Sequence, residues 1–282
     1  MLPYKKKSSS PLPEGKKTAS HSHSTGTTTQ THETKSSANS SGLDNLLQLC
    51  GQSSKSTFLE VMSMYSNRSS ISKHGEGRYG EVFTDGQNVF KSVAVQNGLL
   101  VKDYEKQLEA LFAEAKISQT LNTLRTESEH NFCSTFIKTS RICVCSGPYT
   151  DDLKRAKEKW DIEHNSRNSM SLGGQSFVVF AQENGGQDLK SFKLLSFKEA
   201  QSVLAQVTIA LAVAEAAFEF EHRDLHWENI VLNRNSSETM SFVLDGEKKD
   251  VKTYGVVASI IDFTFSRIKI PPSSNGKDVV SL

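Results

Sequence analysis

Short apolar runs with alternating polar positions predict strands at four places in the first two thirds of the chain. The runs at 81–84 and 88–95 are separated by Asp85-Gly86, a dipeptide typical of a tight hairpin turn. Two further runs, at 141–145 and 176–180, are rich in β-branched and aromatic residues. The sequence therefore predicts a hairpin early in the fold, followed by two more strands.

Apolar residues at helical spacing predict three helical regions between and around these strands. The region 43–66 is predicted to be helical with a break near Gly51, and the charged stretch 150–172 to be a loop with some helix. A helix after the hairpin is predicted by the i, i+3, i+4, i+7 spacing of Leu108, Leu111, Phe112 and Ala115.

The clearest helical pattern covers 197–219. Ser196 and Glu199 have the spacing of a capping box at its start. Its apolar stripe consists of Leu204, Val207, Leu211, Ala214 and Phe218. This stripe is predicted to be the buried face of the helix.

Three short strands are predicted after this helix, at 230–232, 241–244 and 256–261. Asp245-Gly246 is a second turn signal between them. Strands and one helix thus come first, and a long helix with further hairpins follows. This order predicts an α+β fold with two lobes.

The composition changes near residue 43 and predicts the domain organisation. Residues 1–42 contain 17 Ser or Thr and three of the six prolines, too little apolar surface to offset chain entropy. We expect a disordered tail at 1–42, a helical lead-in at 43–66 and a folded domain at 67–282. Within that domain we expect one lobe at about 67–182 and a second lobe at 183–282.

Charge and cysteine content exclude several classes of protein. The net charge of +1 gives no general case for binding nucleic acid or membranes by electrostatics. The tail carries +4 and the remainder −3, and clusters at Lys5–Lys7 and Lys16–Lys17 are either a nuclear import signal or simply solvated. The four cysteines are predicted to be buried thiols rather than a disulfide framework or a zinc site.

No signal peptide or membrane span is predicted. The N-terminal lysines are not followed by an apolar core, as a secretory signal would require. No apolar run reaches the roughly 18 residues that cross a bilayer.

A glycine-rich segment precedes the hairpin, with Gly75, Gly77 and Gly80 followed by Val82. Glycines allow the backbone to approach phosphate groups closely. A dinucleotide-binding loop would open a helix, whereas this one leads into a strand, which favours a strand–loop–strand flap. A plain glycine hairpin is the alternative at this point.

A second motif favours the phosphate-binding interpretation of the glycine-rich segment over a plain hairpin. His222-Arg223-Asp224-Leu225 with Asn229 fits the protein-kinase catalytic loop H-R-D-L-x-x-x-N directly after an apolar helix. Asp262-Phe263-Thr264 follows a strand where a kinase carries its metal-binding aspartate. Lys91 on the second hairpin strand and Glu114 on the next helix complete the set in the expected order.

The sequence resembles the haspin family of protein kinases over about 70–270. The resemblance lies in 200–229, which ends in His-Arg-Asp-Leu-His-Trp-Glu-Asn, in Glu183–Leu189, in Trp160-Asp161 and above all in Ile260–Thr264. Haspins carry Asp-Tyr-Thr where most kinases have Asp-Phe-Gly. The resemblance implies a two-lobed kinase-like α+β fold, with an antiparallel sheet in the first lobe and helices in the second.

The resemblance also implies a function and a role for each motif residue. Haspins are nuclear serine/threonine kinases that phosphorylate a threonine near the N-terminus of histone H3 in mitosis. ATP and Mg²⁺ are the expected cofactors. The residues expected at the nucleotide are Gly75, Glu76, Gly77, Gly80, Val82, Lys91, Glu183, Gly185, Asp188, Asn229 and Asp262.

Individual roles follow the kinase pattern. Lys91 is expected to bind the α and β phosphates, and Glu114 to hold Lys91 in place. Asn229 and Asp262 are the expected Mg²⁺ ligands, and Asp224 is expected to orient the substrate hydroxyl. His222 is expected to be structural rather than catalytic, and His226 and Trp227 are expected to pack the loop. Phe263 with Thr264 is expected to fix an active arrangement without activation-loop phosphorylation.

Three interpretations remain open at this stage. The first is an active histone kinase, monomeric, associated with chromatin in the nucleus or present in the cytoplasm, and without direct DNA or membrane binding. The second is an inactive, truncated pseudokinase that binds nucleotide or chromatin proteins, because the family's later helices are absent from this sequence. The third is a nonfunctional truncation product. Two smaller departures are Glu228 in the catalytic loop and a polar hinge with Gln182 and Asn184.

Overall fold

The computed structural model describes residues 42–65, 71–77, 80–95, 101–166, 175–270 and 279–281. The predictions for the tail and its two lysine clusters fall outside these ranges. The helices are α1 (Gly42–Leu49), α2 (Phe58–Ser63), α3 (Val101–Thr123), α4 (Asp151–His164), α5 (Phe197–Phe218) and a 3₁₀ turn (Trp227–Asn229). The strands are β1 (Ser56–Thr57), β2 (Ser72–Gly77), β3 (Gly80–Thr84), β4 (Asn88–Val95), β5 (Thr139–Ser146), β6 (Ser176–Glu183), β7 (Gln187–Asp188), β8 (Ile230–Arg234), β9 (Thr239–Leu244), β10 (Glu247–Lys252), β11 (Val256–Ile260), β12 (Ile268–Ile270) and β13 (Val279–Ser281).

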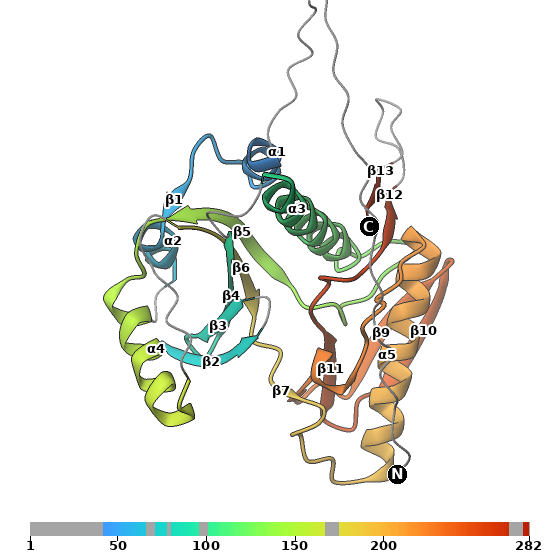
Figure 1. Cartoon of the computed structure of the whole chain (residues 1–282). Coiled ribbons are helices and arrows are strands. Elements are labelled where there is room, and N and C mark those ends of the chain that lie inside the picture. Colours follow the sequence, from blue (N-terminus) through green and yellow to red (C-terminus); the bar gives the residue numbers. More distant parts are fainter. Residues whose placement is uncertain are drawn as a thin grey trace, which may run out of the picture. The chain divides into compact units, whose positions relative to one another are not determined.

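The first lobe is built on a six-stranded sheet in the order β1-β5-β6-β4-β3-β2 (Figure 1). All its pairings are antiparallel except that of β1, which joins β5 in parallel. The predicted α+β kinase-like architecture is confirmed. Strand β2 and the added strand β1 are features that the apolar pattern did not predict, since neither carries a regular alternation of apolar residues.

The predicted hairpin at Asp85-Gly86 is present and joins β3 to β4. The buried Asp85 carboxylate accepts hydrogen bonds from the backbone N–H groups of Gln87, at 2.9 Å, and Asn88, at 2.6 Å. Gly86 has a φ of 92°, a conformation that favours glycine. This turn fixes the register that places Val82 opposite Lys91.

Helix α3 is held against the sheet by the lead-in segment. Leu46 of α1 is fully buried in a cluster with Leu108 and Leu111 of α3. The side chain of Gln52 bonds both backbone groups of Val144, donating to the carbonyl at 3.1 Å and accepting from the N–H at 2.7 Å. The lead-in, predicted as helix with a break near Gly51, is two short helices with the unpredicted strand β1 between them, and it braces α3 and β5.

The cysteines are free thiols, as predicted. Cys133, Cys143 and Cys145 are buried, and Cys50 is partly buried. Burial raises the pKa of Cys50 and of Cys133 to about 12 each, so both are protonated at neutral pH. These side chains serve as apolar packing groups.

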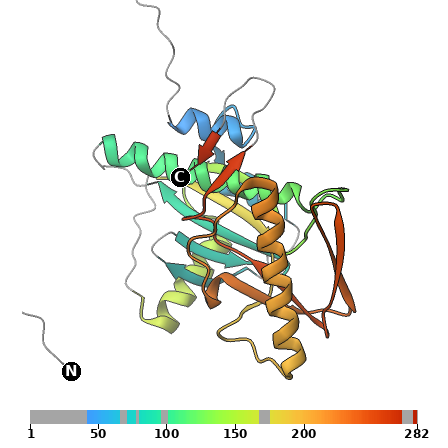
Figure 2. The ribbon, with the colours of Figure 1, turned by 90° about the vertical axis from the view of Figure 1, so that its right-hand side faces the viewer.

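The second lobe combines α5 with three small sheets (Figure 2). Strands β11, β8 and β7 form one sheet, and β9 with β10 forms a hairpin that turns at Asp245-Gly246, as expected. Strand β10 was not predicted, because its sequence EKKDVK is almost entirely polar. Segment 132–137 crosses between the lobes: the Ile137 N–H donates to the Ile260 carbonyl, and the Ile260 N–H donates to Thr135.

The predicted buried stripe of α5 is wrong in part. Leu204 is 68% exposed, and Leu211 and Phe218 are only partly buried. The buried face instead includes Val203, Gln206, Val207, Ala210, Val213 and Ala214. Gln206 is on this face because its amide bonds the backbone of β11, donating to Val256 and accepting from the N–H of Ala258. A polar side chain in the core cannot be recognised from an apolar periodicity.

The start of α5 also differs from the expected capping box. Ser196 does accept from the Glu199 N–H, at 3.2 Å. The Glu199 carboxylate, however, accepts from the N–H of Leu195 at 2.7 Å and pairs with Arg234 at 3.0 Å. The reciprocal half of the box is thus replaced by contacts that fasten the helix to β8.

Contrary to the sequence expectation, α5 is long and apolar enough to cross a membrane by length and composition. In the structure it packs on β9, β10 and β11 and takes part in the core of the second lobe. The hydrogen bonds of Gln206 and the Arg234–Glu199 ion pair mark it as the core helix of a folded lobe.

The charged stretch 150–172 is more regular than expected. Helix α4 covers 14 of its residues and ends at His164, and the capping residue Asn165 has a φ of 50°. Leu153, Ala156 and Lys157 are its buried residues, spaced for one face of a helix. Residues 167–174 lie outside the described ranges.

The packing of α1 on α3 gives a first prediction. Replacing the fully buried Leu46 by alanine should lower the free energy of unfolding by about 2–5 kcal/mol, because it leaves a cavity under α3. Leu59→Ala is the matched control, since Leu59 is 60% exposed and should cost about 0.5 kcal/mol or less. Urea denaturation of both variants measures the difference, and equal losses would contradict the bracing role of α1.

Candidate active site

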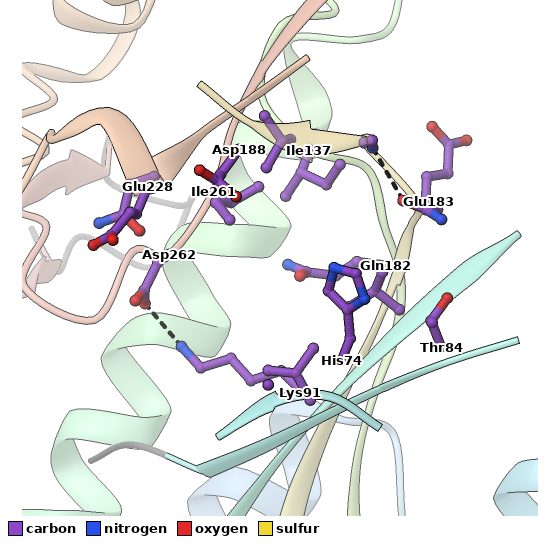
Figure 3. Close-up of a pocket in the computed structure, with 18 of the residues that line it drawn as sticks. His74, Thr84, Lys91, Ile137, Gln182, Glu183, Asp188, Glu228, Ile261 and Asp262 are labelled. Carbon is purple, nitrogen blue, oxygen red and sulfur yellow. Dashed lines mark hydrogen bonds and ion pairs between the residues drawn. The ribbon is translucent and has the colours of Figure 1, made fainter. Parts of the chain in front are cut away.

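A cavity of about 670 Å³ lies between the two lobes (Figure 3). Strands β2, β3 and β4 form one wall, residues 182–186 form the back, and β8 with the loop 224–229 forms the opposite wall. Most of the predicted nucleotide-site residues line it, namely Gly75, Glu76, Gly80, Val82, Lys91, Glu183, Gly185, Asp188, Asn229 and Asp262, together with Asp224. The structure therefore gathers residues from across the sequence at one place.

The two walls of the cavity are apolar where they face each other. Val82 and Val89 lie on the first-lobe side, and Val231 and Ile261 on the other, with Ile137 between them. An apolar slot between two walls suits a flat aromatic ring. Of these residues only Val82 was predicted. Val89 could have been found, because it is two residues before Lys91 on the same strand and so shares its face.

The chain at the back of the cavity contains two consecutive glycines. A Cβ at Gly185 would lie 2.4 Å from Val231 Cγ2, and one at Gly186 would lie 2.2 Å from the Leu232 carbonyl oxygen. Gly186 also has a φ of 98°. Glycine is therefore required here for the chain to pass close to β8, which brings Asp188 to the cavity.

The predicted site residue Glu183 turns its carboxylate away from the cavity. Glu183 pairs with Lys138, at 3.0 Å, and with Arg125, at 3.6 Å. Only the backbone of Glu183 is therefore placed to meet a ligand. At the back of the cavity, the Gln182 amide donates to Thr139 Oγ1 at 3.2 Å, so this polar residue is held by β5.

The glycine-rich segment forms the β2–β3 turn at the edge of the cavity. Gly77 pairs with Gly80, and Arg78 and Tyr79 between them lie outside the described residues. Gly80 has a φ of 136°, and a Cβ there would lie 2.4 Å from the Ser92 carbonyl oxygen. The Glu76 carboxylate bonds Lys73 and Ser166, so here too the backbone is the part available to a ligand.

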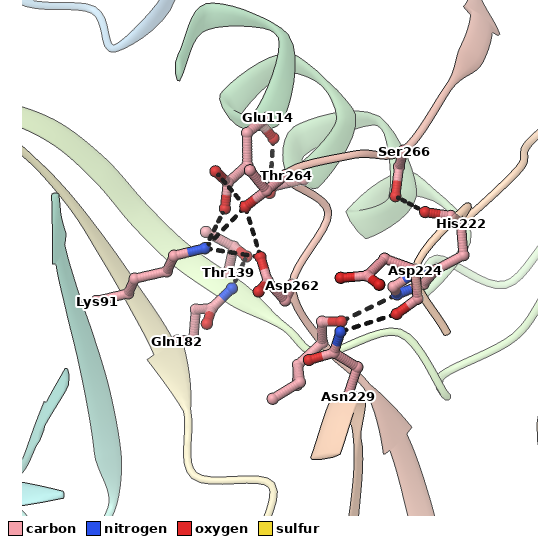
Figure 4. A network of polar contacts seen from close by, with 12 residues as sticks. Lys91, Glu114, Thr139, Gln182, His222, Asp224, Asn229, Asp262, Thr264 and Ser266 are labelled. Carbon is pink, nitrogen blue, oxygen red and sulfur yellow. Dashed lines mark hydrogen bonds and ion pairs between the residues drawn. The ribbon is translucent and has the colours of Figure 1, made fainter. Parts of the chain in front are cut away.

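Lys91 is the centre of the polar groups in the cavity (Figure 4). Its Nζ lies 2.7 Å from Glu114 Oε1 on α3 and 2.8 Å from Asp262 Oδ1 after β11. Both ion pairs join segments distant in sequence, and the second joins the two lobes. The predicted Lys91–Glu114 pair is present in the structure.

The electrostatics of this site keep Lys91 and Asp262 charged. Burial alone would lower the pKa of Lys91, but Glu114 and Asp262 outweigh it and raise that pKa above its usual value. Burial would likewise raise the pKa of Asp262, yet Lys91 and Thr264 hold it below its ordinary range. At neutral pH the ammonium and the Asp262 carboxylate are therefore both ionised.

Thr264 adds a hydroxyl to this arrangement. Its Oγ1 lies 2.6 Å from Asp262 Oδ1, 3.1 Å from Glu114 Oε2 and 3.2 Å from Lys91 Nζ. A glycine at this position could make none of these contacts. Asp262 itself has a φ of 62°, a strained conformation that the surrounding contacts maintain. Thr264 therefore fixes the carboxylate in this orientation.

The catalytic-loop residues face the same cavity. The Asn229 amide nitrogen donates to the Asp224 carbonyl at 2.9 Å, which leaves Oδ1 as the atom available to a cation. The Asp224 carboxylate lines the cavity and is 45% exposed. Arg223 has a φ of 64°, and its side chain pairs with Glu221 at 2.9 Å.

Asn229 and Asp262 fit a magnesium site of the predicted kind. One amide oxygen and one ionised carboxylate are suitable ligands for Mg²⁺, which in kinases completes its shell with phosphates and water. Within the described ranges, no three His, Cys, Asp or Glu side chains gather into a site of protein ligands alone. The metal is thus expected to bind together with a phosphate ligand.

His222 has the structural position that was predicted, whereas Trp227 differs from its prediction. His222 is buried, and its Nε2 bonds the Ile261 carbonyl at 3.0 Å, as a structural residue would. His226 accepts from the Glu228 N–H through Nδ1. Trp227, in contrast, is 60% exposed, so the expectation that it packs the loop is wrong. Glu228 pairs with Lys190 at 2.6 Å on the surface.

These positions together can bind a nucleoside triphosphate and orient a hydroxyl. The apolar slot takes a base, Lys91 and the glycine-rich backbone take phosphates, and Asp262 with Asn229 takes a cation. Asp224 stands on the same side as the cation ligands, where it can accept a hydrogen bond from a hydroxyl substrate.

Comparison with known proteins gives a consistent result. The family model described as "Haspin like kinase domain" matches residues 4–281. A serine/threonine-protein kinase haspin homolog of Arabidopsis thaliana is 49% identical over 228 residues, which cover 79% of this chain and 38% of that protein.

Animal and fungal relatives are more distant. The serine/threonine-protein kinase haspin of Bos taurus is 36% identical over 210 residues, covering 70% of this chain and 26% of that protein. A Schizosaccharomyces pombe haspin homolog is 28% identical over 216 residues, covering 74% of this chain and 42% of that protein. In each case the aligned region spans less than half the length of the relative.

The hydroxyl of Thr264 gives a prediction on stability. Thr264→Val keeps the shape but removes the hydrogen bonds to Asp262 and Glu114, and should lower the free energy of unfolding by about 1–3 kcal/mol. Thr239→Val, at an exposed position of β9, should change it by about 0.5 kcal/mol or less. Denaturation curves test this, and an unchanged midpoint for Thr264→Val would contradict the proposed contacts.

The buried His222 gives a prediction on pH dependence. Burial lowers its pKa below the ordinary 6.5, so the unfolded chain takes up this proton more readily than the native one. The free energy of unfolding should therefore rise with pH up to about 6.5 through this group and be level above it. His222→Gln should flatten this rise, whereas His130→Gln, at an exposed site, should retain it. The same slope in both variants would exclude His222 as its source.

Proposed function

Because the chain belongs to the haspin-like kinase domain family, we propose that it is a serine/threonine kinase acting on a histone tail. In this proposal it transfers the γ-phosphate of ATP to a threonine of the histone H3 N-terminal tail, as part of mitotic chromosome signalling. The proposed cofactors are ATP and Mg²⁺.

The observation that carries the proposal is the pairing of Lys91 with both Glu114 and Asp262 beside Asp224. Lys91 Nζ lies within 2.8 Å of each carboxylate. In protein kinases the lysine–glutamate pair and the metal-binding aspartate must both be in place for activity. An assembled arrangement of this kind supports catalysis over nucleotide binding alone.

The reaction then assigns one task to each residue. The Lys91 ammonium neutralises phosphate charge while Glu114 keeps it forward, and Asn229 and Asp262 hold the cation. Mg²⁺ supplies countercharge for the phosphates when bound. Asp224 accepts the hydrogen bond and then the proton of the threonine hydroxyl, whose oxygen forms the new bond to phosphorus as the bond to the β-phosphate oxygen breaks and ADP leaves.

The charge at the cavity supports a basic peptide as substrate. Asp188, Asp224 and Glu228 all line it, and Lys190 pairs with Glu228 at 2.6 Å. A histone tail is rich in positive charge, so the two surfaces are complementary. The proposal adds location in the nucleus, association with chromatin in mitosis and a monomeric state, without direct DNA or membrane binding.

The fixed position of Lys91 supports activity without phosphorylation of the segment after Thr264. Arg223 is already paired with Glu221, and Thr264 already holds Asp262. Treatment with a phosphatase should therefore leave the rate of peptide phosphorylation unchanged. Complete loss of activity after this treatment would overturn that part of the proposal.

The direct test is transfer of radiolabelled γ-phosphate from Mg·ATP to an H3 N-terminal peptide. Asp224→Ala should lower the rate by about a hundredfold or more, because the substrate hydroxyl loses its hydrogen-bond acceptor. Asp250→Ala, at a surface carboxylate paired with Lys248, should leave the rate unchanged. If the folded protein binds nucleotide without transferring phosphate, it is instead a nucleotide-binding pseudokinase.

A further inference from the structure

A buried cluster of charged residues lies outside the cavity, between the β2–β3 hairpin and α4. Lys73 of β2 and Lys157 of α4 both bond Glu81 Oε1 of β3, at 2.8 Å and 2.9 Å. Asp161 of α4 pairs with Lys157 at 3.2 Å and lies 3.6 Å from Lys73. None of these residues takes part in the roles assigned above.

The strand alternation places this cluster behind the glycine-rich segment. Val82 and Thr84 of β3 line the cavity. Glu81 and Phe83 alternate with them along the strand and therefore point to the opposite, buried side. On β2 an irregularity in the pairing falls between Lys73 and Gly75. The hairpin that borders the cavity with one face is thus attached to α4 through its other face.

The cluster is too deeply buried to be a surface ion pair. The Lys73 side chain is fully buried, and that of Glu81 is 5% exposed. Burial alone would raise the pKa of Glu81, but hydrogen bonds from Lys73, Lys157 and Tyr149 hold it below its ordinary value. Removing one partner of such a buried pair is costly, because the remaining charge is left uncompensated.

Two further contacts connect this cluster and the end of α4 to the glycine-rich segment. Glu76, directly before Gly77, bonds Lys73 through Oε2 at 2.6 Å and Ser166 through Oε1 at 2.6 Å. Ser166 follows the αL residue Asn165 that ends α4. Trp160 of α4 lies under Lys73, with Nζ 5.9 Å from the ring centre.

We propose that α4 is a clamp that positions the glycine-rich segment over the nucleotide. Helix α4 does so through its contacts with the β2–β3 hairpin, and the clamp is the set of residues that make these contacts, namely Lys73, Glu76, Glu81, Lys157, Asp161 and Ser166. Its members are positioning residues, since they act through the backbone of 75–77 and of Gly80. The inference rests on the proposed function in that the ligand of the cavity is a nucleotide. It also gives a role to the Trp160-Asp161 pair that the sequence analysis singled out.

The clamp determines how strongly the nucleotide binds rather than how fast phosphate is transferred. If the loop is in position in only a fraction of molecules, the apparent dissociation constant rises by the reciprocal of that fraction. The groups at the reacting end of the cavity, such as Asp224 and Asp262, belong to the other lobe. The rate of phosphate transfer at saturating nucleotide should therefore be unaffected.

The test compares two lysines on the same helix. Lys157→Met removes the clamp contacts with Glu81 and Asp161, whereas Lys159→Met removes an exposed pair with Glu163. Three quantities are measured on the full chain: amide hydrogen exchange of 75–82, the dissociation constant of Mg·ADP, and KM and kcat for ATP.

For Lys157→Met we expect faster exchange at 75–82 and a dissociation constant and KM raised about fivefold, with kcat nearly unchanged. Lys159→Met should match the wild type in all three. Lys157→Arg keeps the charge and should recover most of the affinity. Ser166→Ala, which removes the hydrogen bond from the hydroxyl to Glu76, should show a smaller effect in the same direction.

The inference is overturned if Lys157→Met loses thermal stability while its exchange at 75–82 and its Mg·ADP affinity equal those of Lys159→Met. The lysine would then be merely structural. Failure of the proposed function is a separate outcome. A wild-type chain that binds Mg·ADP but transfers no phosphate still reports on the clamp through exchange and affinity.

Discussion

The buried ammonium of Lys91 is the constraint on which the other features of this structure depend. A charge in this position is tolerated only when carboxylates compensate it, and Glu114 and Asp262 do so from α3 and from the segment after β11. The pairs thus require the sheet, α3 and the second lobe to meet at one point. Asp262 adopts a positive φ to take part, and Thr264 holds it there. Strain and burial are located at the same site, as is common where function requires a fixed geometry.

Much of the remaining fold serves to keep this meeting point in place. Helix α1 and Gln52 brace α3 and β5 from outside, so that Glu114 cannot easily withdraw. The glycines at 185 and 186 let the chain pass from the first lobe to β8 without separating the walls of the cavity. On the far side of the hairpin, α4 holds the glycine-rich segment. Three supports from different parts of the sequence thus act on a single cavity.

The sequence was sufficient to predict the residues at the centre but not those that support them. The catalytic-loop motif, Lys91, Glu114 and Asp262 could be found because their types and order are dictated by the chemistry of phosphate and Mg²⁺. The hairpin at Asp85-Gly86 follows from turn geometry. The polar partners could not be found, since Gln206 in the core, the buried Lys73 and the polar strand β10 all contradict simple apolar patterns. The carboxylates of Glu76 and Glu183 turn away because Lys73 and Lys138 attract them, and the sequence alone does not say which carboxylates will be paired in the folded chain.

A crystal structure of the chain with Mg²⁺ and a non-hydrolysable ATP analogue tests the central claim most directly. The account predicts the base between Val82 and Ile261, the metal at Asp262 and Asn229, and Lys91 bonded to phosphate while it keeps its pair with Glu114. A nucleotide bound elsewhere, or a Lys91 that remains on Asp262 with the phosphates turned to solvent, would contradict it.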